Sequence, residues 1–303
     1  MLYAMGTYTI GVDVGGTKIQ AGLVGPNGVL RQSKQFLIGK KTKKNILKCM
    51  GTSIDYFFSN RVRAIGIGTT GLVNAEKGVV TRGHNLARDW HGVRLKQLLE
   101  KKYRVTVAID NDVHASALAE ATVGAGKKFR TVAVMAIGTG IGFGLVIDKR
   151  LYRTGCNTTE LGHIAIAATS PWCSCGQRGH FEALASGTAM VKLYRKRTGK
   201  TLTSYEIVAR ARAGNRHANA ILAAMAHDLG IGIANTLHLF SPDILVLTGG
   251  LSSIRPLIHP AIRSARKCLI YPELKKIPIT VSELGYGTGV IGAALLTQHK
   301  VTA

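Results

Sequence analysis

One pattern occurs twice in this chain and restricts the folds that it can adopt: an apolar strand runs into a glycine turn, and a second strand follows. The first copy is Val12-Asp13-Val14-Gly15-Gly16-Thr17, and the second is Ala136-Ile137-Gly138-Thr139-Gly140. Between and after the two copies, apolar runs of strand length alternate with segments of helical spacing. Two related α/β domains that face a cleft are the simplest organisation that accounts for this repetition.

Apolar periodicity and turn residues predict where the elements lie. We expect strands at residues 8–14, 19–24, 29–36, 63–69, 105–109, 131–137, 143–147 and 243–247, and helices at 45–58, 95–103, 112–120, 183–195, 204–213, 215–239 and 287–296. The expected domains are an N-terminal α/β domain over residues 1–120, completed by the C-terminal helix 287–303, and a larger α/β domain over 121–286.

The composition excludes several classes of protein. Apolar residues make up 46% of the 303 residues and charged residues 18%, which is typical of a globular chain and not of a disordered one. The longest apolar stretch, 131–147, is too short and too rich in glycine to span a bilayer, and the N-terminus lacks the basic start of a signal peptide. Five cysteines form a poor disulfide framework in a chain of this length, so we expect a reducing, cytoplasmic location.

The chain is strongly basic, with 40 Lys and Arg against 16 Asp and Glu, a formal net charge of +24. The basic residues are dispersed along several expected helices and are not interleaved with aromatic side chains as in a stacking platform. Dedicated nucleic-acid binding is therefore not expected. Long-range attraction of anionic ligands such as ATP follows from the charge in any case.

The glycine turns are candidate anion sites. Successive glycines let backbone N–H groups approach an anion closely, while Thr17 and Lys18 add a hydroxyl and a positive charge. An acidic residue such as Asp13 among such groups is best explained as a partner for Mg²⁺. A second turn of this type is Gly138-Thr139-Gly140-Ile141-Gly142, and a third is Gly249-Gly250, although a single turn of this kind is weak evidence.

The segment Asp110-Asn111-Asp112 lies where an expected strand meets an expected helix. Two interpretations stay open at this point. Asp112 could cap the N-terminus of the helix, which is a purely structural role. Alternatively, its carboxylate could accept a proton from a substrate hydroxyl while Asn111 holds another hydroxyl.

A cluster of metal-ligand residue types follows in a short window of the second half. His163, Cys173, Cys175 and His180 form a His₂Cys₂ set around a glycine-rich knuckle, which is suited to a closed tetrahedral zinc site. Two incidental free cysteines are the alternative interpretation. Glu160 and Glu182 flank the set and could bind several hydroxyls of a polyol.

Taken together, the motifs resemble those of the ROK family of sugar kinases. The resemblance covers nearly the whole chain and is carried by Asp13-x-Gly-Gly-Thr17, Gly66-Ile-Gly-x-x-Gly71, Asn85-Leu86, Asn111-Asp112, Gly138-Thr139-Gly140, the Cys173-x-Cys175 knuckle and Gly249-Gly250. It implies an α/β protein with the two-domain actin–hexokinase-like (ribonuclease H-like) fold, which binds sugar and ATP in a cleft between the domains.

The resemblance also implies roles for individual residues. Asp112 would be the general base that takes the proton of the sugar's primary hydroxyl. The positions that match the family's sugar-binding set are Gly71, Asn85, Asn111, Asp112, Glu160, His163 and Glu182. The positions that match its nucleotide and Mg²⁺ set are Asp13, Gly15, Gly16, Thr17, Lys18, Gly138, Thr139, Gly140, Gly142, Gly249 and Gly250. His163 would bind a structural Zn²⁺ as well as the sugar.

Three departures from the family pattern concern the site. His180 stands where a third knuckle cysteine is usual, and imidazole is an acceptable zinc ligand. Thr159 replaces the glycine that is common before Glu160 and adds bulk beside the sugar pocket. Thr70 and Asn74 stand where proline and aspartate are frequent.

The function that the resemblance implies is ATP-dependent transfer of a phosphoryl group to the 6-hydroxyl of a hexose, with glucose as the leading substrate and a homodimer as the leading assembly. An N-acetylglucosamine or N-acetylmannosamine kinase is the alternative within the same class. A sugar-sensing ROK-type transcriptional regulator is disfavoured, because Asp13 follows the first residue too closely for a preceding helix-turn-helix domain.

Overall fold

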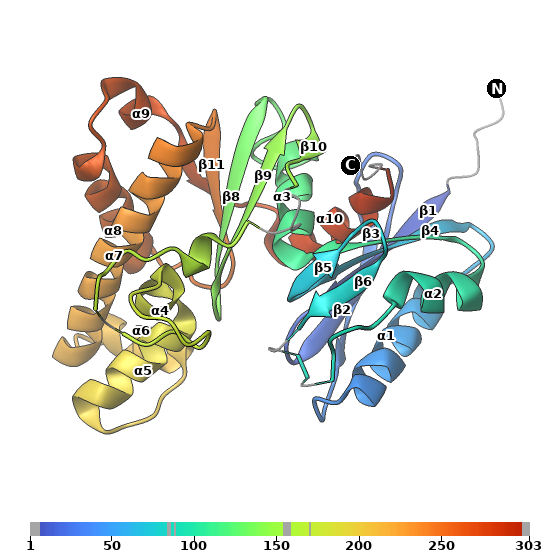
Figure 1. Ribbon diagram of the computed structural model, residues 1–303, viewed down its shortest axis with the longest axis horizontal. Coiled ribbons are helices and arrows are strands. Elements are labelled where there is room, and N and C mark those ends of the chain that lie inside the picture. Colours follow the sequence, from blue (N-terminus) through green and yellow to red (C-terminus); the bar gives the residue numbers. More distant parts are fainter. Residues whose placement is uncertain (1–6, 84–85, 88, 154–158, 170, 299–303) are drawn as a thin grey trace. The chain divides into compact units, whose positions relative to one another are not determined.

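The computed structural model describes residues 7–83, 86–87, 89–153, 159–169 and 171–298 (Figure 1). The chain forms two compact units. The first contains Met1–Arg130, Gly144–Thr159 and Glu283–Ala303, and the second contains Thr131–Phe143 and Glu160–Ser282. The passage from one unit to the other lies inside strand β9 (Ile141–Ile147), so residues 144–159 group with the first unit.

The first unit is built on a five-stranded sheet with the order β3-β2-β1-β4-β7. The strands are β1 (Tyr8–Val14), β2 (Lys18–Val24), β3 (Leu30–Leu37), β4 (Val62–Thr69) and β7 (Thr106–Asn111). The first three form an antiparallel meander, whereas β4 and β7 extend the sheet in parallel with β1. Asp13 lies in register with Gly68 of β4, and Gly68 lies in register with Asp110 of β7. The carboxyl ends of three parallel strands therefore bring acidic residues to one edge.

Helices cover both faces of this sheet, and the alternation of side chains along the strands decides which helix packs where. Ile10 and Val12 join one buried core with Ile46 and Met50 of α1 (Lys43–Phe57). The opposite face carries glycines that let helix α10 (Thr288–Leu295) approach. A Cβ atom at Gly11 would overlap the carbonyl of Val290.

The remaining elements of the first unit are short or flank the sheet. They are β5 (Leu72–Asn74), β6 (Val79–Arg82), α2 (Leu95–Tyr103), α3 (Asp112–Thr122), β10 (Arg150–Leu151) and the 3₁₀ turns Gly285–Gly287 and Leu296–Gln298. Helix α3 packs against α10 and follows β7 directly, so its first residue lies at the carboxyl end of the sheet.

In the second unit, strands β8 (Thr131–Ile137), β11 (Ile244–Thr248) and β12 (Ile279–Val281) are parallel neighbours in the sheet order β10-β9-β8-β11-β12. The helical elements are the 3₁₀ turn Leu161–His163, α4 (Phe181–Ala185), α5 (Gly187–Thr198), α6 (Ser204–Arg212), α7 (Arg216–Phe240), α8 (Arg255–Cys268) and α9 (Pro272–Lys276). Among the described residues, α7 alone is long and apolar enough to cross a membrane. Because 61% of its most apolar stretch is buried in the protein, it has the character of a core helix.

Most of the elements expected from the sequence are present, several with identical bounds, among them 8–14, 95–103 and 131–137. The single helix expected over 183–195 is wrong. The chain forms α4 and α5 there, because Ser186 interrupts the helix and caps α5 by accepting the N–H of Ala189 at 3.2 Å. The sequence analysis also missed α8, α9, β5, β6, β10 and β12.

Candidate functional site

Two carboxylates stand at the carboxyl edge of the first sheet. Asp13 is near the end of β1, and Asp112 is the first residue of α3. Burial, and then the charge of Asp112, raise the pKa of Asp13 to about 7, while the charge of Lys18 acts in the opposite direction. A divalent cation here would relieve both the desolvation and the repulsion, so this pair fits Mg²⁺.

The cap of α3 is Asn111, not Asp112. The Asn111 Oδ1 atom accepts the N–H groups of Val113 at 2.8 Å and His114 at 3.3 Å, and its Nδ2 donates to the carbonyl of Gly71 at 3.1 Å. The interpretation of Asp112 as the N-cap is therefore wrong. Asp112 lies one residue inside the helix, in its first turn.

Gly71, one of the expected sugar-binding positions, follows β4 in a conformation that favours glycine. Its φ is +101°, and a Cβ atom would overlap the carbonyl of Arg82. Its own carbonyl receives the bond from Asn111. Asn85, another expected sugar ligand, lies outside the described residues.

Asp110, two residues before Asp112, is the centre of a buried ionic network that the sequence analysis did not find. Asp110 is fully buried; its Oδ2 accepts two bonds from Arg153, at 3.0 Å from Nε and 2.8 Å from Nη2. Its Oδ1 lies 2.9 Å from Nδ1 of His114, which is itself 3% exposed, and accepts the N–H of Asn111 at 2.7 Å. The four-residue spacing of Asp110 and His114 at the start of a helix is the one local signal for this pairing.

The first glycine turn joins β1 to β2. The N–H of Gly15 donates to the carbonyl of Lys18 at 3.1 Å, which closes the turn over Gly16 and Thr17. The Lys18 ammonium donates to Oε1 of Gln35 at 2.9 Å. A Cβ atom at Gly16 would lie 3.8 Å from the Lys41 ammonium, so a second lysine borders the turn.

The second and third glycine turns lie together in the second unit, where the parallel strands β8 and β11 end side by side. Gly249 has a φ of +88° and packs against the backbone of Ile137, the last residue of β8. The N–H of Leu251 donates to the carbonyl of Ile137 at 2.9 Å. Gly138, Thr139 and Gly140 form the turn after β8, whereas Gly142 lies inside β9.

Glu182 lies against the same turn. Its carboxylate accepts the N–H of Ile141 at 3.2 Å, and a Cβ atom at Gly140 would overlap it. Gly162 packs in turn against the carbonyl of Ile141. Glycine at positions 140 and 162 thus lets Glu182, the β8–β9 turn and the segment before His163 pack closely in this unit.

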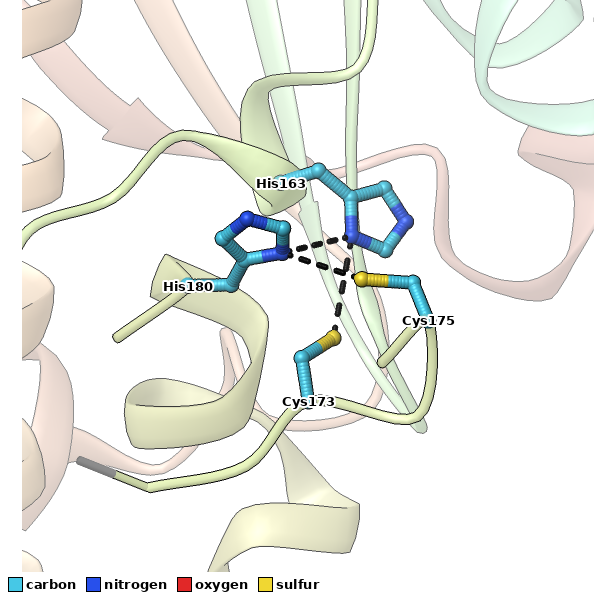
Figure 2. A group of neighbouring side chains, drawn as sticks. All are labelled: His163, Cys173, Cys175 and His180. Carbon is cyan, nitrogen blue, oxygen red and sulfur yellow. Dashed lines mark hydrogen bonds between the residues drawn. The ribbon is translucent and has the colours of Figure 1, made fainter. Parts of the chain in front are cut away.

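Four metal-ligand side chains converge in the second unit, as Figure 2 shows. The Nδ1 atoms of His163 and His180 are 3.3 Å apart, Sγ of Cys173 lies 3.7 Å from Nδ1 of His163, and Sγ of Cys175 lies 3.2 Å from Nδ1 of His180. Tetrahedral coordination with ordinary zinc–ligand bonds places nitrogen and sulfur ligands roughly 3.3 to 3.8 Å apart. These separations lie near that range, and the four ligand atoms all lie within 4.8 Å of one another, so the residues form a candidate metal centre.

Local backbone structure explains why the four ligands meet. Cys173 donates its N–H to Gln177 at 2.8 Å, and Gly176, with a φ of +91°, allows the tight return between them. The pairing of Ala165 with His180 brings the second histidine back beside the first. The other ring nitrogen of His163, Nε2, lies 3.9 Å from the carboxylate of Glu160. Carboxylates in this position orient metal-bound histidines.

Known proteins match this chain over nearly its whole length. The chain is 30% identical to a glucokinase from Thermotoga maritima over 96% of this chain and 98% of that protein, and 30% identical to a glucokinase from Streptomyces coelicolor with the same coverage. The crystal structure of a ROK family glucokinase from Streptomyces griseus with glucose and AMPPNP superposes with a TM-score of 0.85, at 29% identity over 96% of this chain and 99% of that one.

The fold and its glycine turns define a protein of the actin–hexokinase-like α/β class. Residues 9–300 match the profile of the ROK family, so the chain belongs to the ROK family. The same family includes regulators: a xylose repressor from Bacillus subtilis is 27% identical over 96% of this chain and 77% of the repressor.

Proposed function

We propose that this chain is an ATP-dependent sugar kinase that transfers the γ-phosphoryl group to the 6-hydroxyl of a hexose, with glucose as the first candidate. The observation that carries the proposal is the position of Asp112. It lies in the first turn of α3 at the carboxyl edge of the sheet, beside Asp13, with the capping role taken by Asn111. The full-length similarity to glucokinases supports the same activity.

In this proposal the Asp112 carboxylate accepts the proton of the attacking hydroxyl. The new oxygen–phosphorus bond forms as the bond from the γ-phosphorus to the bridging oxygen breaks, and ADP is the leaving group. Asn111, Glu160, His163 and Glu182 bind the other hydroxyls, and Asn85 is proposed for the same role. The residues proposed for the nucleotide are Asp13, Gly15, Gly16, Thr17, Lys18, Gly138, Thr139, Gly140, Gly142, Gly249 and Gly250. Mg²⁺, when bound at Asp13, supplies charge that offsets the negative charge of the phosphates.

We assign zinc to the cluster of His163, Cys173, Cys175 and His180. Two thiolates and two imidazoles whose ligand atoms lie within 4.8 Å of one another suit Zn²⁺ better than harder cations. The metal would fix the ring of His163, and the nearby Glu160 carboxylate would be oriented by the same ring. The proposed metal is therefore structural, but it acts on two of the proposed sugar ligands.

The test is a coupled assay of ADP release with Mg-ATP and a panel of glucose, other hexoses, N-acetylglucosamine and N-acetylmannosamine. We expect turnover on glucose above the rest of the panel. Turnover confined to an N-acetylhexosamine would keep the kinase and change its substrate. Absence of turnover on every sugar, with ATP still bound, would contradict the proposal.

A transcriptional regulator is the second candidate, favoured only by the similarity to xylose repressors and by the charge of +24. A gel-shift titration at physiological salt with random duplex DNA separates the two. Tight, sequence-selective retention would support the regulator, whereas weak binding that declines steeply with salt would reflect charge alone. A homodimer and a cytoplasmic location are further proposals, and light scattering on the purified protein tests the first.

A further inference from the structure

The buried network around Asp110 continues through His114 to Thr159, the residue directly before the proposed sugar ligand Glu160. Nε2 of His114 lies 3.2 Å from Oγ1 of Thr159, while its Nδ1 bonds to Asp110. His114 is thus held at both ring nitrogens. A threonine hydroxyl can donate or accept, so this bond forms whichever ring nitrogen of His114 carries a proton.

The anchor of this network is rigid. Asp110 is fully buried, and the side chain of Arg153 is only 12% exposed and binds one carboxylate oxygen through two nitrogens. The other carboxylate oxygen of Asp110 is held by the N–H of Asn111 and by the His114 ring, so both ends of the carboxylate are fixed. The ring of His114 therefore has little freedom, and the Thr159 hydroxyl bonds to a fixed partner.

Thr159 is also the position where the sequence departs from the glycine that is common in the family. Bulk is one consequence of that change, but the structure shows a bond that glycine cannot make. The bond restrains the residue immediately before Glu160, whose carboxylate lies 3.9 Å from His163. A threonine also restricts the backbone at this position more than a glycine would.

We propose that Thr159 and His114 are positioning residues that set the place of Glu160 and thereby the affinity of the enzyme for its sugar. This inference rests on the proposed sugar-kinase function. Asp110 and Arg153 serve as the anchor. Neither Thr159 nor His114 is assigned any contact with the sugar, the nucleotide or the metal.

The decisive pair of variants is Thr159→Val and Thr159→Ser, because valine keeps the shape and removes the hydroxyl, while serine keeps the hydroxyl. Loss of one such hydrogen bond corresponds to an increase of about five- to ten-fold in the KM for the sugar. We expect that increase in Thr159→Val and less than about a two-fold change in Thr159→Ser. The kcat, the KM for ATP and the zinc content should stay close to those of the unsubstituted protein in both variants. The thermal midpoint should fall in Thr159→Val alone, because the buried His114 ring loses a hydrogen-bond partner.

Sugar affinity is measured in parallel by calorimetry without nucleotide, so that the inference can be judged apart from turnover. A KM and Kd for Thr159→Val equal to those of the unsubstituted protein would overturn it. So would equal losses in the valine and serine variants, or a loss in Thr159→Val that spreads to kcat and ATP affinity. If the unsubstituted protein turns over no sugar, the proposed function fails. The Kd values for the sugar then decide whether Thr159 affects sugar affinity. If it binds no sugar at all, both proposals fail.

Discussion

Asp13 and Asp112 share one electrostatic environment: burial of Asp13, and then the charge of Asp112, raise the pKa of Asp13 to about 7. Two carboxylates this close oppose each other's ionisation, and a cation between or beside them reverses that effect. The pair therefore suits a divalent cation such as the Mg²⁺ of a magnesium–nucleotide complex.

The first prediction concerns Asp112 itself. Asp112→Asn should lower kcat by about 10²- to 10⁴-fold, because the amide cannot accept the hydroxyl proton. Sugar and ATP affinity should change little, as the amide is nearly isosteric. The coupled assay and calorimetry measure the two effects. Glu76→Gln, an exposed carboxylate elsewhere in the first unit, is the matched control and should keep full activity. Robust turnover by Asp112→Asn would remove Asp112 from the proposed mechanism.

The second prediction concerns the metal centre. Elemental analysis should find about one zinc ion per chain, since four ligands complete a tetrahedral site. Cys175→Ser should lose most of the zinc, and its KM for the sugar should rise because the metal no longer fixes His163. His180→Cys should retain the zinc. Cys268→Ser, which changes an exposed thiol outside the cluster, is the control. A metal-free protein with unchanged activity and thermal midpoint would refute the assignment.

The third prediction is an acid dependence of stability. Burial alone would raise the pKa of Asp110, but the hydrogen bond and charge of His114, the charge of Arg153 and the N–H of Asn111 hold it below the ordinary value of 3.8. The carboxylate therefore stabilises the fold fully above pH 4. That contribution is lost as the pH falls further, through the folded-state pKa. Thermal midpoints from pH 7 to pH 3 should show this loss.

Variants separate the buried ion pair from surface charge in the same experiment. Arg153→Ala should cost about 3 to 5 kcal/mol at pH 7, because it leaves a buried carboxylate without its cation. Asp148→Asn breaks the ion pair with Arg130. Because the side chains of Arg130 and Asp148 are 74% and 58% exposed, this variant should change stability little. Equal stability of the two variants would contradict the role given to Asp110.

The fourth prediction compares two helical glycines. A Cβ atom at Gly292 in α10 would overlap the carbonyl of Ala115 in α3, so Gly292→Ala should cost about 1 to 3 kcal/mol or force the helices apart. At Gly51 in α1, the nearest atom is the flexible Lys102 ammonium at 3.6 Å. Gly51→Ala should therefore stabilise by about 0.5 to 1 kcal/mol. Thermal unfolding of both variants measures the difference, and a destabilised Gly51→Ala would contradict the argument.

The elements that the sequence predicts correctly are those in which local pattern and tertiary packing agree. Residues 132–137 form a continuous apolar run, and β8 is buried along most of its length. Helix α8 escaped prediction because Pro260 lies inside it, where proline ordinarily ends a helix; Pro256 lies in the first turn, where proline is tolerated. The split at Ser186 was missed because apolar spacing continues across it.

Site features that are close in sequence could be predicted, and those that join distant residues could not. Glycine turns and the Cys/His cluster are close in sequence, so their chemistry can be read locally, and the structure brings all four expected metal ligands together. Arg153 is 43 residues from Asp110, and nothing in its sequence neighbourhood indicates an ionic partner. The sequence does not decide between a capping and a chemical role for Asp112, because aspartate at the start of a helix suits both.

Ser186 affects when the turn after β8 becomes ordered. Because it starts a new helix, the first N–H groups of α5 become available to the turn after β8. Gly187 donates to Gly138 at 2.8 Å, and Thr188 donates to Thr139 through its backbone at 3.2 Å and its hydroxyl at 2.8 Å. The turn is thus tied in place before any ligand arrives. The entropy cost of ordering this turn therefore falls on folding, and it does not weaken ligand binding in each catalytic cycle.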